Sequence, residues 1–428
     1  MKNKILIILL FSALFFTVLE AYNSNEIYLI QIDGVIGPPI ADYVVKNIEK
    51  AENNNATAVL LEIDTPGGLS TSMRKIITKI INSPIPVIGY VTPEGARAAS
   101  AGAFVMMACD ISAMTPTSNI GAAHPVTMGA KLDSTMERKV MNDMLAHMTS
   151  LAEKRNRNVE VAKKMITESI SLTAKEALEQ NIIDFVAQSR AELLEKIDNF
   201  EIEKNGNKIV LQTENIEIVT LKMNFIERFF YHISNPNIAY ILLMLGIYGI
   251  LAEFSSPGIG FAGVFGTIAL LLAFFALSSL PVNLVGILLI AAGVILLLLE
   301  IKVQSSGILG IGGVVGIILG SMMLIQTGSP FFKISISLII GVGVFTILFF
   351  LLLASLVYQV HRKKVTTGRK GLIGEKGYAK TALKPEGTVF VRGELWQAES
   401  IDGNIKKDEK IQVVKIEHLK LFVKKIKD

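Results

Sequence analysis

One stretch of the sequence constrains the fold more than any other: between Asn235 and Tyr358 the residues are almost all apolar. Apolar runs of about 20 residues, separated by turn-forming clusters, are typical of helices that cross a bilayer. The stretch divides into five expected spans: Asn237–Phe254, Gly260–Leu280, Val282–Ile301, Gly307–Ile325 and Ser335–Tyr358. The break at Pro281 is short, so four spans are the alternative. A chain that is 51% hydrophobic and 19% charged is neither disordered nor wholly soluble.

The N-terminus has the pattern of an export signal. A basic head, Met1–Lys4, precedes the apolar run Ile5–Leu19 and the small residue Ala21. This pattern predicts a signal peptide over residues 1–21, with an uncleaved anchor helix as the alternative. In both cases the segment that follows is exported, into a compartment without a pool of ATP or coenzyme A.

Basic residues after the last span indicate the orientation. His361–Lys364 and Arg369–Lys370 follow the fifth span at once, which predicts a cytoplasmic location for this end. An exported N-terminal domain followed by five crossings also ends in the cytoplasm. The two arguments agree and favour an odd number of spans, in an integral protein of the cell (inner) membrane.

Two kinds of residue stand out inside the spans. Gly312, Gly316 and Gly320 recur every four residues, a spacing that lets helices approach closely, and we expect them to pack against a neighbouring helix. Glu253 and Glu300 lie at span ends on the predicted cytoplasmic side. We interpret them as interfacial residues rather than as a proton path, because no ordered series of intramembrane carboxylates accompanies them.

The segment between the signal and the spans alternates between strand and helix patterns. The expected elements are a strand Ile27–Ile32, a helix Ile40–Glu52, a strand Ala58–Ile63, a helix Ser72–Ile81 and a strand Val87–Val91. Such βαβαβ alternation predicts a parallel sheet with right-handed crossovers. Further along, Glu201–Thr220 predicts a β-hairpin with its turn at Asn205-Gly206.

Functional groups in parallel sheets gather where strands end. The first unusual strand end is Thr65-Pro66-Gly67-Gly68, whose paired glycines let a backbone N–H point into a site without a Cβ in the way. The second is Ser100, which stands among small residues where a helix should begin. A serine there is usually a helix cap, but a helix N-terminus also offers N–H groups to a developing oxyanion. Together the two strand ends favour a serine nucleophile.

A serine nucleophile needs a base, and two residues compete for that role. Lys139 lies in a helix expected over Ser134–Lys154, beside an apolar stripe that we expect to be buried: Met136, Val140, Met144, Met148 and Leu151. A lysine amine becomes a competent base where burial favours its neutral form. His124, in Gly121-Ala-Ala-His-Pro125, is the second candidate, because an imidazole titrates near neutral pH without any special environment.

Four segments, DTPGG, AASAGA, NIGAAHP and SLTAKEALEQNIID, occur in this order and resemble the Clp-protease/crotonase superfamily. With the signal peptide, the glycine-rich spans and the basic tail, the chain is similar to the long membrane-bound serine proteases of the NfeD family. The resemblance implies an α/β Clp/crotonase-like exported domain, an all-α polytopic membrane domain and a small all-β OB-like barrel at the C-terminus.

The resemblance also implies a serine–lysine dyad. The serine of the family's ASAG motif corresponds to Ser100, and the lysine that opens the helix after the variable loop corresponds to Lys139. The paired glycines correspond to Gly67 and Gly68, where the family places an oxyanion donor, and Ala101 beside the serine would supply another N–H.

His124 falls close to the position where soluble Clp proteases keep their histidine. The acid of their triad precedes the SLTA-like segment, and here the only acidic residue of Thr167–Ile170 is Glu168, displaced by one position. A histidine without an orienting carboxylate is a weaker base. Lys139 is therefore the preferred base and His124 the alternative.

The basic tail reads as short alternating segments. The expected strands are Gly377–Leu383, Thr388–Val391, Gln397–Ile401, Lys410–Ile416 and Lys420–Val423. Five short strands predict a small barrel, and the segment resembles the OB-fold C-terminal domain of the NfeD family. Its aromatic residues form no obvious stacking row in the sequence, so we favour a protein-interaction module at the cytoplasmic membrane surface over nucleic-acid binding.

These observations predict an ATP-independent membrane-bound serine endopeptidase that cleaves hydrophobic segments of membrane-associated proteins. One cysteine and five histidines argue against a metal site, and we expect no cofactor. The resemblance implies a stomatin-like partner, and we expect a homo-oligomer in the lipid bilayer. The expected domains are a signal peptide (residues 1–21), a Clp/crotonase-like serine protease domain (22–224), a membrane domain (225–360) and a cytoplasmic OB-fold domain (361–428).

Two other functions were weighed. The first is a non-catalytic membrane scaffold that organises microdomains with a stomatin/flotillin-like partner. The second is a crotonase-type acyl-CoA enzyme, which shares the oxyanion architecture but which the export signal argues against, because coenzyme A substrates are cytosolic.

Overall fold

The computed structural model of the chain describes residues 24–125, 134–255, 260–278, 280–303, 307–325, 330–362 and 369–426. The chain divides into two compact units, Met1–Leu348 and Phe349–Asp428, and each is described by itself. The predicted signal peptide, residues 1–21, lies outside the described residues.

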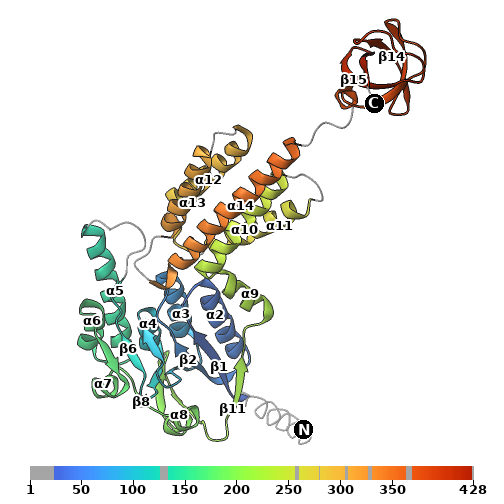
Figure 1. Cartoon of the computed structure of the whole chain (residues 1–428). Helices are drawn as coiled ribbons and strands as arrows, with labels where there is room; N and C mark the ends of the chain where they lie inside the picture. Colours follow the sequence, from blue (N-terminus) through green and yellow to red (C-terminus); the bar gives the residue numbers. More distant parts are fainter. Residues whose placement is uncertain are drawn as a thin grey trace, which may run out of the picture. The chain divides into compact units, whose positions relative to one another are not determined.

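A six-stranded parallel sheet forms the centre of the N-terminal domain (Figure 1). In spatial order its strands are β11 (Glu217–Leu221), β1 (Ser24–Asp33), β2 (Ala56–Asp64), β3 (Val87–Val91), β5 (Ile111–Met114) and β8 (Phe185–Val186). Every neighbouring pair runs parallel. The predicted βαβαβ order and parallel sheet are confirmed.

Each face of the sheet has its own apolar core, because successive side chains on a strand point to opposite faces. Tyr28, Ile30 and Ile32 belong to the larger core, which they share with α2 (Pro38–Asn53), α3 (Ser70–Asn82) and α4 (Ala101–Ala108). Ile27 and Leu29 belong to the smaller core, which α8 (Arg190–Ile197) covers. The sheet is therefore buried on both sides, as parallel sheets usually are.

A second, three-stranded sheet lies beside the first. Its strands are β4 (Arg97–Ala99), β6 (Asn119–Gly121) and β7 (Ser171–Thr173). The remaining helices of the domain are α5 (Ser134–Lys154), α6 (Val159–Thr167), α7 (Ala174–Glu179) and α9 (Phe225–Ile233). The helix predicted over Ser134–Lys154 is confirmed with the same bounds.

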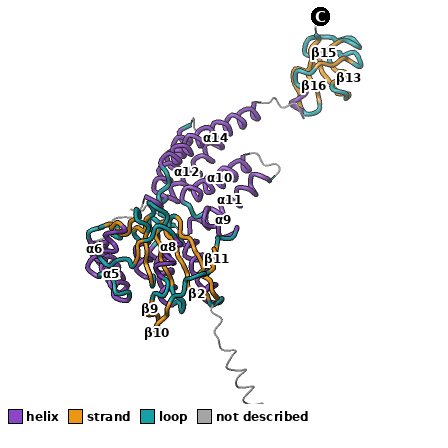
Figure 2. The backbone as a smooth tube through the Cα atoms, turned by 90° about the horizontal axis from the view of Figure 1, so that it is seen from below, coloured by secondary structure: helices purple, strands orange, loops and turns teal. Residues whose placement is uncertain are grey.

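The predicted hairpin over Glu201–Thr220 was right in its turn and wrong in its extent. Strands β9 (Glu201–Lys204) and β10 (Asn207–Val210) pair antiparallel around Asn205-Gly206. The chain then leaves the hairpin, and β11 joins the central sheet parallel to β1. The hairpin is a sheet of its own at the edge of the domain (Figure 2), and Ile202 of β9 belongs to the smaller core.

In the described part of the chain, five apolar helices follow α9. They are α10 (Pro236–Ser255), α11 (Phe261–Ser278), α12 (Leu284–Val303), α13 (Ile308–Leu324) and α14 (Ile336–Arg362), with a short 3₁₀ turn η1 (Pro330–Phe332) before the last. Pro236–Phe254 and Phe261–Ser278 are long and apolar enough to cross a membrane, whereas Leu284–Glu300, Ile308–Leu324 and Ile336–Leu352 are shorter apolar segments. Five spans therefore stay a prediction.

Helices α10–α11 and α12–α13 form two hairpins that repeat one sequence pattern. The repeated positions are Gly246, Glu253, Gly260, Gly263 and Gly266 in the first hairpin, and Gly293, Glu300, Gly307, Gly310 and Gly313 in the second. In the first hairpin the amide of Gly263 donates to Glu253 (3.2 Å), and in the second the amide of Gly310 donates to Glu300 (3.2 Å). Each glutamate thus caps the helix that follows it, which gives both residues a structural role.

The hairpins close tightly because glycines face each other. A Cβ added to Gly266 would lie 2.9 Å from the carbonyl oxygen of Gly246, and one added to Gly313 would lie 2.8 Å from that of Gly293. Added Cβ atoms at Gly316 and Gly320 would also approach the backbone of α12, at 3.2 and 2.7 Å. The expected helix packing is confirmed for these two glycines, whereas a Cβ at Gly312 would meet only a side-chain atom at 3.6 Å.

The second unit contains a closed five-stranded barrel (Figure 2). Its strands are β12 (Lys376–Ala379), β13 (Glu386–Val391), β14 (Glu394–Ser400), β16 (Lys420–Lys425) and β15 (Lys410–Glu417), preceded by the 3₁₀ turn η2 (Arg369–Leu372). Val389, Ala398 and Leu421 are fully buried inside it. The predicted small OB-like barrel is confirmed.

Candidate functional site

Ser100 occupies a backbone position that its neighbours must hold. It lies between β4 and α4, half-buried, with φ 52° and ψ −115°. A positive φ is unfavourable for a serine and persists only where the surrounding structure imposes it. The Ser100 amide donates to the carbonyl of Gly121 (3.0 Å), and the Ser100 carbonyl accepts from the amide of Ala103 (3.0 Å). The backbone conformation of this serine is therefore fixed on both sides.

The glycine turn after β2 lies directly against this serine. Gly67 has φ +111°, and a Cβ added to it would lie 2.6 Å from Ser100 Cβ and 3.1 Å from Ser100 Oγ. No side chain fits there without displacing the serine. The two strand ends singled out in the sequence thus meet in space.

Two backbone amides are available beside the serine. The bridge between Ile36 and Gly68 uses the carbonyl of Gly67 and the amide of Leu69 (both 2.9 Å), which leaves the Gly68 amide facing away from Ile36. Among the described residues neither the Gly68 amide nor the Ala101 amide, at the first position of α4, donates a hydrogen bond. An oxyanion that forms at Ser100 could accept from such amides.

The amide of Gly67 has a different partner. It donates to the side-chain oxygen of Thr65 (3.0 Å), and the Thr65 hydroxyl lies 3.2 Å from the carbonyl of Gly67. Thr65 belongs to the strand end that the sequence singled out, but the pattern assigned it no role of its own. A threonine two residues before a glycine pair is the only signal that could have indicated this contact.

The structure does not bring the preferred base to the serine. Lys139 is exposed on the N-terminal half of α5, and in the described part of the chain it forms no hydrogen bond or ion pair with Ser100. The expected burial of the apolar stripe on α5 was wrong for its first half. Met136 is 48% exposed, and only Met148 and Leu151 of the stripe are buried.

His124 also lies apart from an acidic partner. Its ring Nδ1 is 3.0 Å from the carbonyl of Ile166, and the residue is exposed. Glu168 is the C-terminal cap residue of α6, and no hydrogen bond between Glu168 and His124 occurs in the described ranges. The loop Val126–Asp133, which precedes Lys139, lies outside the described residues.

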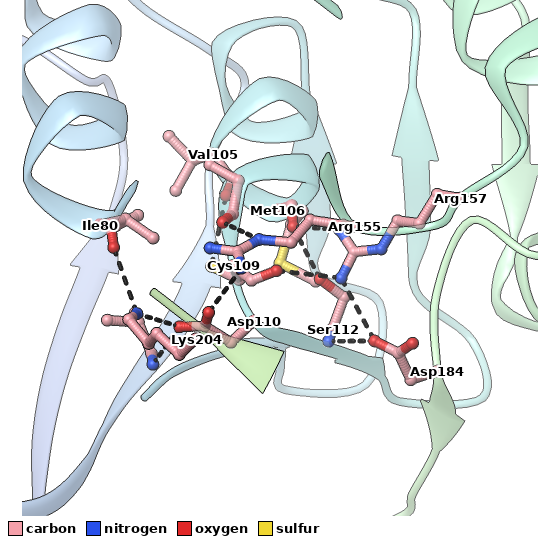
Figure 3. A network of polar contacts seen from close by, with 12 residues as sticks. Ile80, Val105, Met106, Cys109, Asp110, Ser112, Arg155, Arg157, Asp184 and Lys204 are labelled. Carbon is pink, nitrogen blue, oxygen red and sulfur yellow. Dashed lines mark hydrogen bonds and ion pairs between the residues drawn. The ribbon is translucent and has the colours of Figure 1, made fainter. Parts of the chain in front are cut away.

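A buried ionic network anchors the other end of α4 (Figure 3). Arg157 donates to the carbonyls of Met106 (2.7 Å) and Cys109 (3.2 Å), and Arg155 donates to that of Ala108 (2.9 Å). Both arginines follow α5 in the chain, and their guanidinium groups lie at the C-terminus of α4, where cations are favourable. The network therefore joins the helix that begins beside Ser100 to the end of the helix that carries Lys139.

Carboxylates balance these cations. Asp110 pairs with Arg155 (2.6 Å) and with Lys204, and Asp184 pairs with Arg157 (3.2 Å). Burial lowers the pKa of Lys204, which Asp110 partly opposes. Burial also raises the pKa of the Cys109 thiol to about 12, so this cysteine is an inert packing residue at neutral pH.

Comparison with known proteins assigns the chain to a family. Residues 26–218 match the N-terminal domain of NfeD1b, residues 237–355 the NfeD integral membrane domain, and residues 369–425 the NfeD-like C-terminal, partner-binding domain. The chain belongs to the NfeD family. It is therefore an integral membrane protein.

Two relatives extend along almost the whole chain. A membrane-bound protease of Pyrococcus horikoshii is 36% identical over 411 residues, which covers 94% of this chain and 93% of the relative. The membrane protein NfeD1b of Bacillus subtilis is 30% identical over 435 residues, with 94% of each chain covered. Homology to a protease over this length supports a protease as the function of this NfeD-family chain.

Solved structures match individual domains. A membrane protease specific for a stomatin homologue from Pyrococcus horikoshii is 35% identical and covers 49% of this chain and 99% of its own, with a TM-score of 0.44. The C-terminal domain of a stomatin operon partner protein from the same organism is 43% identical over 14% of this chain and 98% of its own, with a TM-score of 0.14.

Proposed function

We propose that this NfeD-family chain is a membrane-bound serine endopeptidase whose nucleophile is Ser100. The observation that carries the proposal is the strained backbone of Ser100, with φ 52°, set against a glycine turn at the first turn of α4. Strained backbone at a nucleophile is a common device for exposing its side chain. The homology to a membrane-bound protease supports the same reaction class.

Each residue of the site has a role in the proposed reaction. The Lys139 amine takes the proton of Ser100 Oγ, which attacks the peptide carbonyl, and the resulting ammonium gives the proton to the leaving amine. The amides of Gly68 and Ala101 donate hydrogen bonds to the oxyanion, whereas the Gly67 amide already donates to Thr65. Water then hydrolyses the acyl-enzyme by the same route. Each step needs only groups of this chain, the peptide and water.

The proposed substrate is an apolar segment of a membrane-associated protein, and the proposed partner is a stomatin-like protein. The serine domain is joined to α10 through α9, so substrates within its reach lie near the bilayer. The protease from Pyrococcus horikoshii is described as specific for a stomatin homologue, and the C-terminal domain matches a partner-binding domain. In this proposal the stomatin-like protein is either cut by the serine domain on the exported side or bound by the barrel in the cytoplasm without being cut.

We further propose that the serine domain, residues 22–224, lies outside the cytoplasm, the membrane domain is residues 225–360, and the barrel, residues 361–428, lies inside. Each of the two helical hairpins would cross the membrane twice and return the chain to its starting side. The single helix α14 then makes the number of crossings odd. Reporter fusions after Ser234 should read outside and those after the barrel inside. Fusions that read the same side would contradict five crossings.

The experiment that tests the protease is cleavage of apolar peptides by the full chain in lipid nanodiscs, wild type against Ser100→Ala. We expect wild-type cleavage and its loss in the variant, with partner binding unchanged. A chain that binds a stomatin-like partner but cleaves nothing would support the scaffold function. Cleavage that survives in Ser100→Ala would show a different nucleophile or a contaminant.

A further inference from the structure

Thr65 ties the glycine turn to the strand that leads to the nucleophile. Its amide donates to the carbonyl of Arg97 (2.7 Å), and its carbonyl accepts from the amide of Ala99 (3.0 Å). The residue is fully buried at the end of β2. Thr65 is thus hydrogen-bonded to β4 immediately before Ser100.

The side chain of Thr65 makes two further contacts, one with each half of the site. Its Oγ1 accepts from the amide of Gly67 (3.0 Å). Its Cγ2 methyl packs against α4, because a Cβ added to Gly102 would lie 2.5 Å from that methyl. One buried side chain therefore touches both the turn that carries Gly68 and the helix that begins with Ala101.

We propose that Thr65 is a positioning residue of the oxyanion site, which rests on the proposed protease function. Its hydroxyl accepts from the amide of Gly67 and also lies 3.2 Å from the carbonyl of Gly67, which shares a planar peptide unit with the Gly68 amide. These contacts set the direction in which the Gly68 amide points. Thr65 does not touch the substrate. It acts through the two glycines, whose backbone has no side chain of its own to restrain it.

The consequence of losing the hydroxyl follows from this arrangement. The buried amide of Gly67 would be left without an acceptor, and the turn would relax to find one. Loss of an entire oxyanion donor lowers kcat by about 100- to 1,000-fold. Misdirection of the Gly68 amide should therefore lower kcat by about 10- to 100-fold and leave KM nearly unchanged, because the oxyanion exists only in the transition state.

Two substitutions separate the hydroxyl from the methyl. Thr65→Val keeps the shape and removes Oγ1, whereas Thr65→Ser keeps Oγ1 and removes the methyl that contacts α4. The full chain in nanodiscs is assayed for peptide cleavage and for the rate at which a fluorophosphonate probe labels Ser100, since the probe's phosphoryl oxygen occupies the oxyanion site. We expect Thr65→Val to lower kcat and the labelling rate together, and Thr65→Ser to restore both to within about threefold of wild type.

A second buried threonine is the matched control. Thr213 is 5% exposed, and its hydroxyl donates to the carbonyl of Leu194 (2.6 Å) in the core on the other face of the sheet. Thr213→Val should lower thermal stability as much as Thr65→Val but leave kcat and labelling unchanged. If Thr213→Val lowers kcat equally, the effect of Thr65 is general destabilisation and the positioning role is wrong.

The outcomes also separate this inference from the protease function. Wild-type activity that Thr65→Val leaves unaltered would overturn the positioning role while the protease stands. A Thr65→Ser variant as slow as Thr65→Val would overturn it too, because the methyl and not the hydroxyl would then be responsible. A wild-type chain that neither cleaves peptide nor takes the probe would overturn the protease function, and the positioning role with it.

Discussion

The two halves of the proposed dyad lie in very different surroundings. On the nucleophile side, Ser100, Gly67 and Thr65 are joined through backbone hydrogen bonds and close contacts, and α4 is buried along its length. On the lysine side, every residue from Ser134 to Lys139 is exposed. The serine is therefore held in place by its neighbours, whereas the lysine is exposed to solvent.

The difference follows from where α5 is held. Its C-terminal half contributes Met148 and Leu151 to the core, and Arg155 beyond it bonds to α4. Its first residues, Ser134–Lys139, are exposed and have no such cover. A lysine acts as a base in its neutral form, which burial favours. In the proposed mechanism a bound substrate therefore has to supply the cover that completes the site.

The largest expected effect concerns the choice of base. Lys139→Ala should lower kcat by about 100- to 10,000-fold, the contribution of general acid–base catalysis. His124→Ala should retain most activity, because among the described residues no carboxylate orients the ring. Wild-type activity should also rise towards alkaline pH, since the amine works in its neutral form. Kinetics of the two variants across pH are the measurement.

The reverse result would change the comparison. If His124→Ala is inactive and Lys139→Ala is active, the base is the histidine and the exposed half of α5 has no catalytic role. The helix would then serve another purpose, and the site would be complete without a covering substrate.

The second prediction tests the contact between the glycine turn and Ser100. Gly67→Ala should lower kcat by about 100- to 1,000-fold, because the added Cβ would lie 2.6 Å from Ser100 Cβ and must displace the turn or the serine. Gly95→Ala is the matched control. It also has a positive φ, +81°, but its added Cβ meets no described atom within 4 Å, so it should show strain of about 1 kcal/mol and normal kcat. Equal loss in both variants would show that backbone strain, not contact with the serine, is responsible.

The sequence predicts well what local patterns determine. The apolar run before Asp64, the breakers after it and the periodicity of Ser134–Lys154 predict the strand, the turn and the helix that the structure contains. Ser100 follows β4, which lies in the three-stranded sheet, and the glycine turn reaches it because Thr65 pairs in parallel with Ala98 of β4. The sequence singled out both strand ends, but their meeting depends on this pairing between distant segments.

What the sequence does not predict depends on distant partners. The stripe on α5 shows which side chains can be buried but not whether anything covers them, so Met136 is exposed despite its place in the pattern. Strand β11 pairs with β1, far away in the chain, and no local pattern distinguishes it from a hairpin strand. Thr65 is one hydroxyl in a turn, and its role depends on an amide two residues on whose direction only the fold determines.

The prediction with the smallest expected effect on activity compares two thiols, one on the serine side of the site and one on the lysine side. The chain has one cysteine, Cys109, which lies fully buried at the closed end of α4 with its pKa raised to about 12 by burial. Iodoacetamide reacts with the thiolate, so at pH 8 native Cys109 should react roughly a thousandfold more slowly than an exposed thiol. Met136→Cys puts a thiol on the open half of α5, where it should react at the exposed rate and leave kcat within about twofold of wild type. Mass spectrometry of the two labelled peptides compares both positions in one molecule.

The same pair of thiols shows whether substrate closes the open half. In a Ser100→Ala chain that carries Met136→Cys, saturating apolar peptide cannot be cut and stays bound. If bound substrate covers the first turns of α5, labelling at position 136 should slow at least severalfold, while Cys109 stays as slow as before because the ionic network already closes that end of α4. If peptide leaves the labelling rate at position 136 unchanged, the cover for Lys139 comes from elsewhere. If Cys109 is labelled as fast as position 136, the serine side of the site is not closed to the reagent.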